Sequence, residues 1–260
     1  MRATFAALAL GTAVLTGCVT SDEHRGRNTV AEGLAVIEAH DAIMAAIADP
    51  LRPAADTARD VNRKPMDTVM FAGVKPGAVV AELAPGGGYY TRILARAVGP
   101  NGHVYALVPA AFAQRPGGLD ALNALAAQYG NVTVMAADYT ALSLPRPADV
   151  AWTSENWHDF HNGPTANPAG IARGVYAALR PGGLFYIEDH AAPGTGATAT
   201  STLHRIDPAL VITELTAAGF KLDGQSSVLA NPNDPHSARS NDPAIRGETD
   251  KFALRFRKPG

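Results

Sequence analysis

The sequence predicts an α/β protein built on a doubly wound, mostly parallel sheet of seven strands, preceded by a helical extension. Short apolar runs alternate with segments of helical periodicity, which is the pattern of repeated strand-helix-strand units. Polar residues follow several of these runs directly, where the carboxyl ends of parallel strands form a ligand-binding edge. With 260 residues, 47% of them hydrophobic, the chain can bury one sizeable core.

The first strand leads into a glycine-rich turn that indicates a ligand site. Residues 78–83 are mostly small or β-branched and pass into Pro85-Gly86-Gly87-Gly88. From Tyr90 apolar residues recur at helical spacing as far as Gly99-Pro100. Strand, glycine turn and helix form the first half of a nucleotide-binding unit, in which the backbone approaches the ligand closely. A tight turn without a ligand is the alternative at this point.

The remaining elements follow in order along the chain. We expect strands at 102–109, 132–136, 148–153, 184–188, 220–229 and 251–257, and helices at 29–48, 66–72, 90–98, 119–128, 168–179 and 207–219. Asp207-Pro208 is a good helix start, because the aspartate caps the free N–H groups and proline fits the first turn. The loop 230–250 is long and rich in Asn, Pro and Asp, which is typical of a functional lid or of a disordered segment.

The N-terminus looks like a targeting segment. A short basic start, an apolar run and Leu15-Thr16-Gly17-Cys18 resemble a bacterial lipobox, in which the signal is cut before a cysteine that is then lipidated. Cys18 is the only cysteine of the chain. We expect a signal peptide at 1–17, a tether at 18–29, a helical extension at 30–73 and the main domain at 74–260. The protein would then be an exported periplasmic lipoprotein, anchored at the outer membrane; an ordinary signal peptide is the alternative.

The charge of the chain argues against nucleic acid as a partner. The formal net charge is −2 and basic residues are scattered, so nothing in the sequence favours nucleic acid. We expect a small-molecule substrate, and contact with a membrane only through the lipid anchor.

The motifs at the strand ends resemble those of one enzyme class. They are Pro85-Gly86-Gly87-Gly88-Tyr89-Tyr90-Thr91, Asn156-Trp157-His158-Asp159, Asp189-His190, Leu203-His204-Arg205-Ile206-Asp207-Pro208 and Asp242-Pro243-Ala244-Ile245-Arg246-Gly247. In this order they resemble class I S-adenosylmethionine-dependent methyltransferases and, more narrowly, a bacterial family of exported predicted methyltransferases. The resemblance implies a Rossmann-like fold whose last two strands form an antiparallel hairpin, with S-adenosylmethionine as the cofactor.

The resemblance also implies a set of cofactor-binding residues. Glu82, Gly86 and Gly88 would line the methionine and ribose end, and Asp138 would reach the adenine amino group. The complete set that we predict is Glu82, Pro85, Gly86, Gly87, Gly88, Tyr90, Asp138 and Asn156. Two positions depart from the class pattern, because Ala84 replaces a glycine and 107–109 offers no acidic residue for the ribose hydroxyls. An unpaired buried hydroxyl costs roughly 1–3 kcal/mol.

Methyl transfer needs alignment and often a base, and the polar strand ends supply candidates. We predict His158, Asp159 and His190 as catalytic residues, with structural hydrogen bonding as the alternative for each histidine. A metal is a further alternative. The residues His158, His161, His190, His204, Asp159 and Asp189 could bind a divalent cation such as zinc. The glycine and proline at 163–164 favour a loop over a helix that would pair two of these histidines, so we predict no metal site.

The functional hypothesis is therefore methyl transfer from S-adenosylmethionine to a small molecule or to a component of the cell envelope. The alternative is a periplasmic lipoprotein that keeps the fold as a non-catalytic or metal-dependent binding module.

Overall fold

The computed structural model describes residues 21–260, with side chains from Val30 onward. The predicted signal peptide and the lipidation site Cys18 lie outside the described residues. Helix α1 spans Ser21–Ile47, so the backbone of 21–29, which we expected to form a tether, is helical. Residues 37–260 form one compact unit. None of the described helices has both the length and the apolarity of a membrane span.

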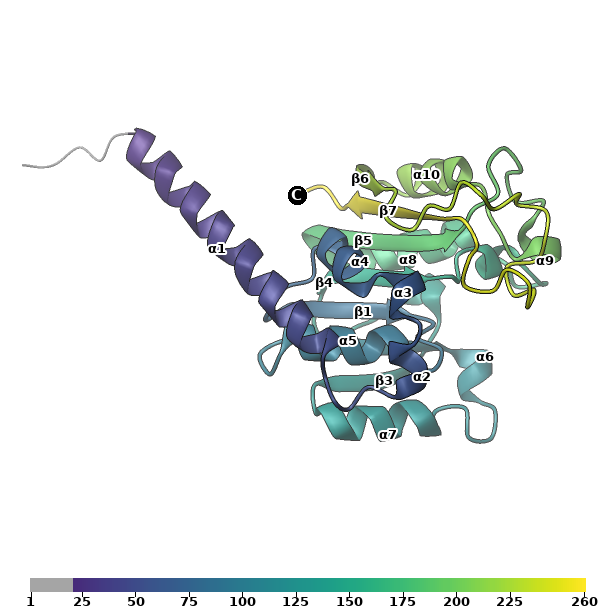
Figure 1. The fold of residues 1–260 in the computed structure, drawn as a ribbon, viewed down its shortest axis with the longest axis horizontal. Coiled ribbons are helices and arrows are strands. Elements are labelled where there is room, and N and C mark those ends of the chain that lie inside the picture. Colours follow the sequence, from purple (N-terminus) through teal and green to yellow (C-terminus); the bar gives the residue numbers. More distant parts are fainter. Residues whose placement is uncertain (1–20) are drawn as a thin grey trace, which may run out of the picture. The chain divides into compact units, whose positions relative to one another are not determined.

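The sheet has the predicted architecture. Its strands are β1 (Val79–Leu83), β2 (His103–Pro109), β3 (Val132–Ala137), β4 (Ala148–Ser154), β5 (Leu179–His190), β6 (Lys221–Ser226) and β7 (Lys251–Arg257). The spatial order is β3-β2-β1-β4-β5-β7-β6 (Figure 1). Strand β7 runs antiparallel to both neighbours, and the other neighbouring pairs are parallel. The fold class and the C-terminal hairpin are thus confirmed.

The longer helices also lie where the sequence predicts them. They are α4 (Pro65–Ala72), α5 (Tyr89–Val98), α7 (Asp120–Tyr129), α8 (Pro168–Ala178) and α10 (Pro208–Ala217). The Asp207 carboxylate accepts a hydrogen bond from the backbone N–H of Ala209, as expected for a cap. The short helices were not predicted. They are α2 (Ala54–Thr57), α3 (Asp60–Arg63), α6 (Ala110–Ala113), α9 (Thr200–Leu203) and the 3-10 turns η1 (Tyr139–Ala141) and η2 (His158–His161).

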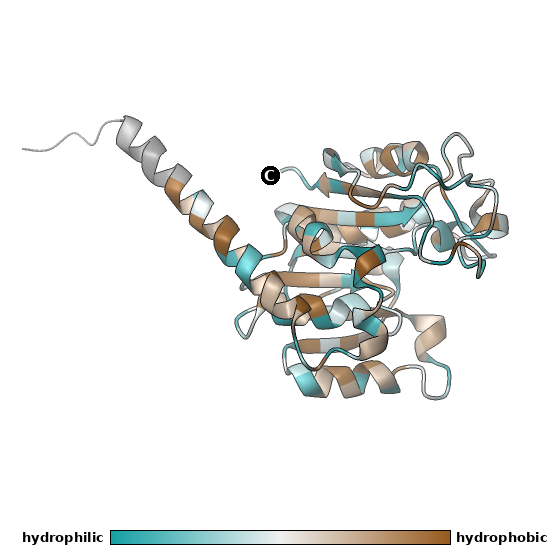
Figure 2. Cartoon of the chain, viewed as in Figure 1, coloured by the Kyte–Doolittle hydropathy of each residue, from teal (hydrophilic) through white to brown (hydrophobic). Residues whose placement is uncertain are grey.

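The core lies in two layers, one on each face of the sheet. Alternate residues of a strand point to opposite faces. Val80 therefore packs with buried residues of α4, α5 and α7, whereas Ala81 and Leu83 pack with those of α8 and α10. Hydrophobic residues accordingly recur along the central strands (Figure 2). Burial on both faces explains why β1 reads as a continuous apolar run interrupted only by Glu82.

Ion pairs hold α2 and α3 against the start of α5. The buried Arg52 guanidinium donates to Asp60 Oδ1 and Oδ2 at 2.5 and 2.9 Å and to the Ile47 carbonyl at 2.7 Å. The Tyr89 hydroxyl donates to Asp60 Oδ1 at 2.6 Å. Arg92 pairs with Asp56 at 3.0 Å. The residues before the first strand thereby form a wall beside the glycine turn.

The loop between β6 and β7 is held by another buried ion pair. Arg205 Nη1 lies 2.7 Å from Asp234 Oδ2, and both side chains are almost fully buried. Asp234 also accepts hydrogen bonds from the backbone N–H groups of His236 and Asp250, at 3.0 and 2.6 Å. The segment expected to be a lid or disordered is therefore tied to the body near its start, at Asp234.

The close contact between α8 and η1 depends on Gly174. A Cβ atom at this position would lie 2.0 Å from the Tyr139 carbonyl oxygen. We expect Gly174→Ala to destabilise the fold by about 1–3 kcal/mol, because the helix must move away from the turn. Thermal unfolding should show a midpoint lower by roughly 2–12 °C. Gly33→Ala is the control, since no atom lies within 4 Å of the added Cβ. Equal midpoints for both variants would contradict this explanation.

Candidate active site

A cavity of about 200 Å³ opens at the carboxyl ends of β1 and β4. From β1 the chain continues to β2 and β3 on one side of the sheet, and from β4 it continues to β5 on the other side. The position between β1 and β4 is therefore the topological switch point, where doubly wound sheets bind ligands. Three segments line it: the β1 end and glycine turn (82–87, 89–90), the β4 end (Trp152, Ser154, Glu155, Asn156), and the wall before β1 (Asp56, Arg59, Arg63).

Two of the three glycines in the turn face this cavity. The N–H of Gly88 donates to the Pro85 carbonyl at 3.0 Å and closes the turn. A Cβ atom at Gly86 or Gly87 would meet no atom within 4 Å, so both positions border open space. A Cβ at Gly88 would lie 2.5 Å from Leu125 Cδ1. Gly88 therefore permits close packing of α5 on α7, while Gly86 and Gly87 leave room for a ligand.

The floor of the cavity contains two residues in an unusual backbone conformation. Ala84 and Glu155, at the ends of β1 and β4, have φ angles of +51° and +58°. The Asn156 amide donates to the Ala84 carbonyl at 3.2 Å and to the Ser154 carbonyl at 2.6 Å, and thus joins the two turns. Left-handed backbone at a residue other than glycine costs of order 1–3 kcal/mol and concentrates at functional sites.

Glu82 is a buried carboxyl group with an altered affinity for protons. It accepts a hydrogen bond from Thr91 Oγ1 at 2.6 Å. Burial raises its pKa to about 7, even though the Thr91 hydroxyl and the charge of Arg63 act in the opposite direction. The carboxyl group is therefore close to its titration point at neutral pH, and a ligand cation beside it would favour the ionised form.

A buried charge cluster forms the side of the cavity next to β5. The Arg63 guanidinium binds the Glu155 carboxylate and lies 4.8 Å from the centre of the Tyr89 ring and 5.4 Å from that of Tyr90. Burial alone would raise the pKa of Glu155, but Arg63 and Lys251 are among the charges that lower it to about 2. Burial raises the pKa of the fully buried Glu188.

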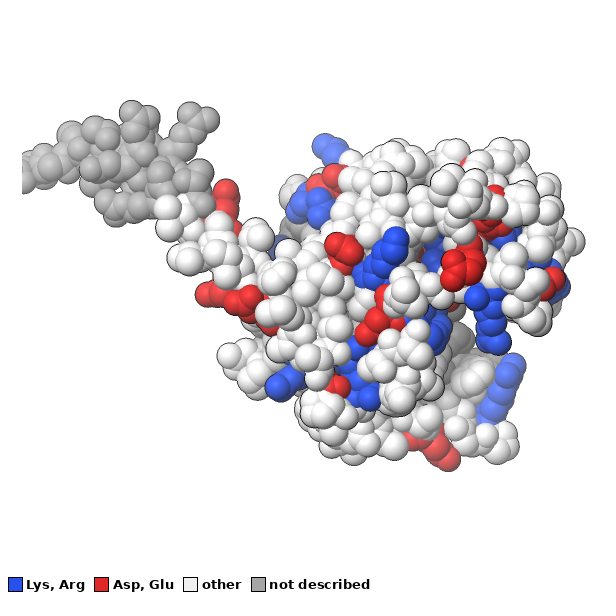
Figure 3. All heavy atoms as spheres, viewed as in Figure 1, with Lys and Arg blue, Asp and Glu red and all other residues white. Residues whose placement is uncertain are grey.

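A second cavity, of about 510 Å³, adjoins the first and is strongly basic. The two share Arg59, Arg63 and Glu155. The second is also lined by Asn62, His190, Ser240, Asn241, Arg246, Gly247 and Lys251. It therefore has four basic side chains against one carboxylate. Figure 3 shows basic side chains beside a hollow in the molecular surface. The field in this cavity favours an anionic ligand.

His190 is the predicted catalytic residue that lines a cavity. Its Nδ1 lies 2.8 Å from Thr249 Oγ1. Burial lowers its pKa to about 4, so the imidazole is neutral at physiological pH. A neutral ring has one nitrogen that accepts a hydrogen bond. His190 can therefore accept a hydrogen bond from a hydroxyl or amine group in the basic cavity.

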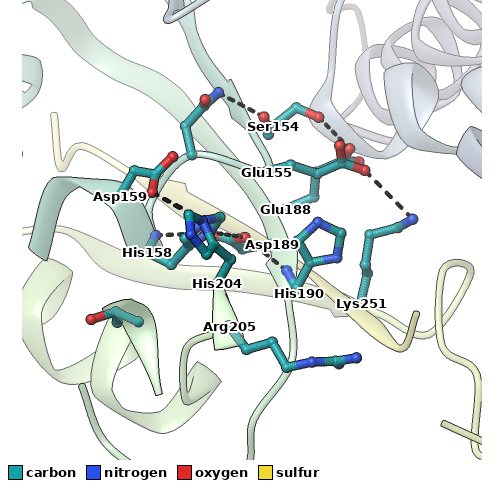
Figure 4. Close-up of polar contacts among 12 residues, drawn as sticks. Ser154, Glu155, His158, Asp159, Glu188, Asp189, His190, His204, Arg205 and Lys251 are labelled. Carbon is teal, nitrogen blue, oxygen red and sulfur yellow. Dashed lines mark hydrogen bonds and ion pairs between the residues drawn. The ribbon is translucent and has the colours of Figure 1, made fainter. Parts of the chain in front are cut away.

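His158 and Asp159, the other predicted catalytic residues, belong to a separate cluster (Figure 4). His158 Nδ1 lies 2.7 Å from Asp189 Oδ1, and the backbone N–H of His158 donates to Asp189 Oδ2 at 2.8 Å. Neither His158 nor Asp159 is among the residues that line the two cavities. They meet His204, which comes from the end of α9.

Most of the predicted cofactor-binding residues line a cavity, and Asp138 does not. Glu82, Pro85, Gly86, Gly87, Tyr90 and Asn156 line the first cavity. Asp138 is exposed and accepts hydrogen bonds from the N–H and hydroxyl of its neighbour Thr140, at 2.9 and 2.7 Å. Sequence reasoning missed the site roles of Arg59, Arg63 and Glu155. The only signal for the arginine wall was three arginines, at 52, 59 and 63, between the helices predicted at 29–48 and 66–72.

Comparisons with known proteins agree with this geometry at the level of the fold. No family model and no curated protein matches the sequence. A SAM-dependent methyltransferase from Aquifex aeolicus superposes with a TM-score of 0.57 at 16% identity, over 78% of this chain and 95% of that one. The chain has the fold of class I methyltransferases.

Two further structures show the range of this fold. The glycopeptide N-methyltransferase MtfA, solved in complex with S-adenosylmethionine, gives a TM-score of 0.52 at 17% identity, over 78% of this chain and 87% of that one. The cyclase SpnF gives 0.56 at 15% identity, over 81% of this chain and 84% of that one. The methyltransferase fold is thus shared by proteins with different named activities, and function must be argued from the site.

The raised pKa of Glu82 predicts a pH-dependent effect of Glu82→Gln. The carboxyl group has an ordinary pKa near 4.5 and a folded-state pKa of about 7. Between these values the folded state retains a proton that the unfolded state has released, so stability falls as pH rises through this window. Gln cannot ionise. We therefore expect the variant to be more stable than the unchanged chain by about 3 kcal/mol at about pH 8, with little difference at about pH 4.

Urea unfolding at several pH values measures this difference. Glu248→Gln, which makes the same substitution at an exposed position, is the control. A stability difference for Glu82→Gln that is the same at both ends of the range would show that Glu82 does not titrate in this window.

Proposed function

We propose that the protein is an S-adenosylmethionine-dependent methyltransferase that acts on a small acceptor bearing a negative charge. The observation that carries this proposal is the first cavity: two glycines border open space beside a buried carboxyl group at the switch point of the sheet. The fold likeness to methyltransferases, one of them solved with this cofactor, supports it.

The residues of the first cavity fit the cofactor chemically. S-adenosylmethionine carries a carboxylate, an ammonium group and a sulfonium centre. Arg59 and Arg63 would bind the carboxylate, while Glu82 and Glu155 offer negative charge to the two cations. Gly86 and Gly87 allow the backbone to approach. The fit is poorest at the ribose, because β2 ends at Pro109 and passes into α6 without an acidic residue.

The bound cofactor would supply an electrophilic methyl group. The chain would contribute alignment, since Arg246 and Lys251 attract an anionic acceptor into the cavity next to the cofactor site. His190, neutral at physiological pH, would accept a hydrogen bond from the acceptor and orient its nucleophilic atom. Glu155, shared by both cavities and paired with Arg63, would separate the two ligands.

The cellular location is part of the same proposal. The lipobox resemblance at Leu15-Thr16-Gly17-Cys18 supports an exported lipoprotein, which would place the acceptor in the cell envelope. Metabolic labelling with a tagged fatty acid would test this, because Cys18→Ser should abolish labelling if Cys18 is the acylated residue.

Gly87 provides the sharpest test of the cofactor. Its backbone φ is not in the left-handed region and a Cβ there meets no atom, so Gly87→Val should fold while filling the cavity. S-adenosylmethionine at a hundred times its dissociation constant should stabilise the unchanged chain by about 2.7 kcal/mol. This raises the thermal midpoint by roughly 5–11 °C, and Gly87→Val should lose the shift. Gly33→Val is the matched control. No shift for the unchanged chain at millimolar cofactor would refute methyl transfer and favour the non-catalytic binding module.

Arg246 provides a separate test of the acceptor's charge. It is an exposed arginine of the basic cavity, and an exposed charge pair contributes up to about 1 kcal/mol. We expect Arg246→Gln to weaken binding of pyrophosphate about fivefold in calorimetric titration. Arg173→Gln, an exposed arginine on α8 outside the cavity, should bind as the unchanged chain does. Equal affinities for both variants would argue against this cavity as an anion site.

A further inference from the structure

The cluster of His158, Asp159 and His204 has the dimensions of a metal site. Three potential ligand atoms, one from each residue, lie within 4.8 Å of one another. His158 Nε2 lies 3.3 Å from His204 Nδ1 and 3.4 Å from Asp159 Oδ1. The third side of the triangle, from His204 Nδ1 to Asp159 Oδ1, is 3.5 Å. The three atoms therefore form a nearly equilateral triangle. Figure 4 shows the three side chains gathered together.

These distances match one face of a tetrahedral zinc site. Zinc binds histidine nitrogen and carboxylate oxygen at about 2.0–2.2 Å, and the edge of a regular tetrahedron is about 1.63 times the distance from its centre to a vertex, so ligand atoms lie about 3.3–3.6 Å apart. All three sides of the triangle fall within this range.

A second, independent observation concerns the other nitrogen of His158. The Asp189 carboxylate, which is fully buried, lies 2.7 Å from Nδ1 and also accepts the backbone N–H of His158. This contact fixes the ring with Nδ1 towards Asp189 and Nε2 towards the other two atoms of the triangle, so that Nε2 is the nitrogen available to a metal. Metal-binding histidines typically make this contact with a carboxylate through their second nitrogen.

We propose that His158, Asp159 and His204 bind a divalent transition-metal cation, with zinc as the best chemical match, and that Asp189 positions His158. Two nitrogens and one carboxylate oxygen are an ordinary zinc ligand set. The side chains of His204 and Asp159 are 30% and 50% exposed, so a water molecule can reach the fourth vertex. Three protein ligands with one open position are typical of catalytic zinc sites. This proposal does not rest on S-adenosylmethionine.

The test is metal binding by the full chain after treatment with a chelator. We expect one equivalent of Zn²⁺ in calorimetric titration, and Co²⁺ should give the intense visible absorption of a tetrahedral complex. Asp189→Asn should weaken Zn²⁺ binding about 10–100-fold, as loss of an outer partner does. His204→Asn and Asp159→Asn, which remove a ligand at partly exposed positions, should weaken it more. His236→Gln is the matched control, because His236 pairs with Asp250 at 2.9 Å outside the cluster.

The zinc-binding measurements on these variants either support the proposed site or overturn it. Stoichiometric binding that is lost in His204→Asn and Asp159→Asn and kept in His236→Gln supports the site, provided that the variants unfold at the same temperature as the unchanged chain. The proposal is overturned by the absence of stoichiometric binding. It is equally overturned if His204→Asn binds Zn²⁺ as tightly as the unchanged chain, since binding then occurs elsewhere.

Discussion

The ion pair between Arg63 and Glu155 is the contact on which the site depends. It joins α3, which precedes the sheet in sequence, to the end of β4, and both residues border both cavities. Glu155 makes this contact from a left-handed backbone conformation, beside which the amide of the next residue, Asn156, joins the turns after β1 and β4. Because Arg63 is buried, removing its partner would leave a charge without compensation, which costs about 3–5 kcal/mol. The wall of the cavity and the backbone of its floor are therefore coupled.

The two cavities on either side of this ion pair differ in charge and therefore suit different ligands. The first cavity offers both signs, with arginines on the wall and the carboxyl groups of Glu82 and Glu155 nearby. The second has an excess of positive charge. A cofactor that carries both signs of charge suits the first cavity, and an anionic acceptor suits the second. Because SpnF, a cyclase, has a similar fold, the architecture by itself does not assign a function to this chain.

The sequence predicts the sheet well because its signals are local. The apolar run of β1, the glycine turn and the cap at Asp207 each follow from a few adjacent residues, and the structure has all three. Helices α2 and α3 have four residues each and no detectable period, and they are positioned by the ion pair of Arg52 with Asp60. The sequence singles out His158, Asp159 and His204 among candidate metal ligands but does not favour a metal, because the spacing rule considers only ligands on one element. His204 lies 46 residues from His158 and reaches it only in the folded chain.

The side chains at the end of β5 reach the buried charge cluster, the basic cavity and the cluster of His158, because they alternate between the two faces of the sheet. Glu188, Asp189 and His190 are consecutive, and neighbouring side chains of a strand point to opposite faces. Glu188 and His190 therefore serve the charge cluster and the basic cavity on one side, while Asp189 reaches His158 on the other. Pairing with β7 fixes this arrangement, with Glu188 opposite Ala253 and His190 opposite Lys251. A shift of one residue would exchange the two faces. The register of β5 with its two neighbours β4 and β7 thus determines that Asp189 orients His158 and that Glu188 joins the buried charge cluster.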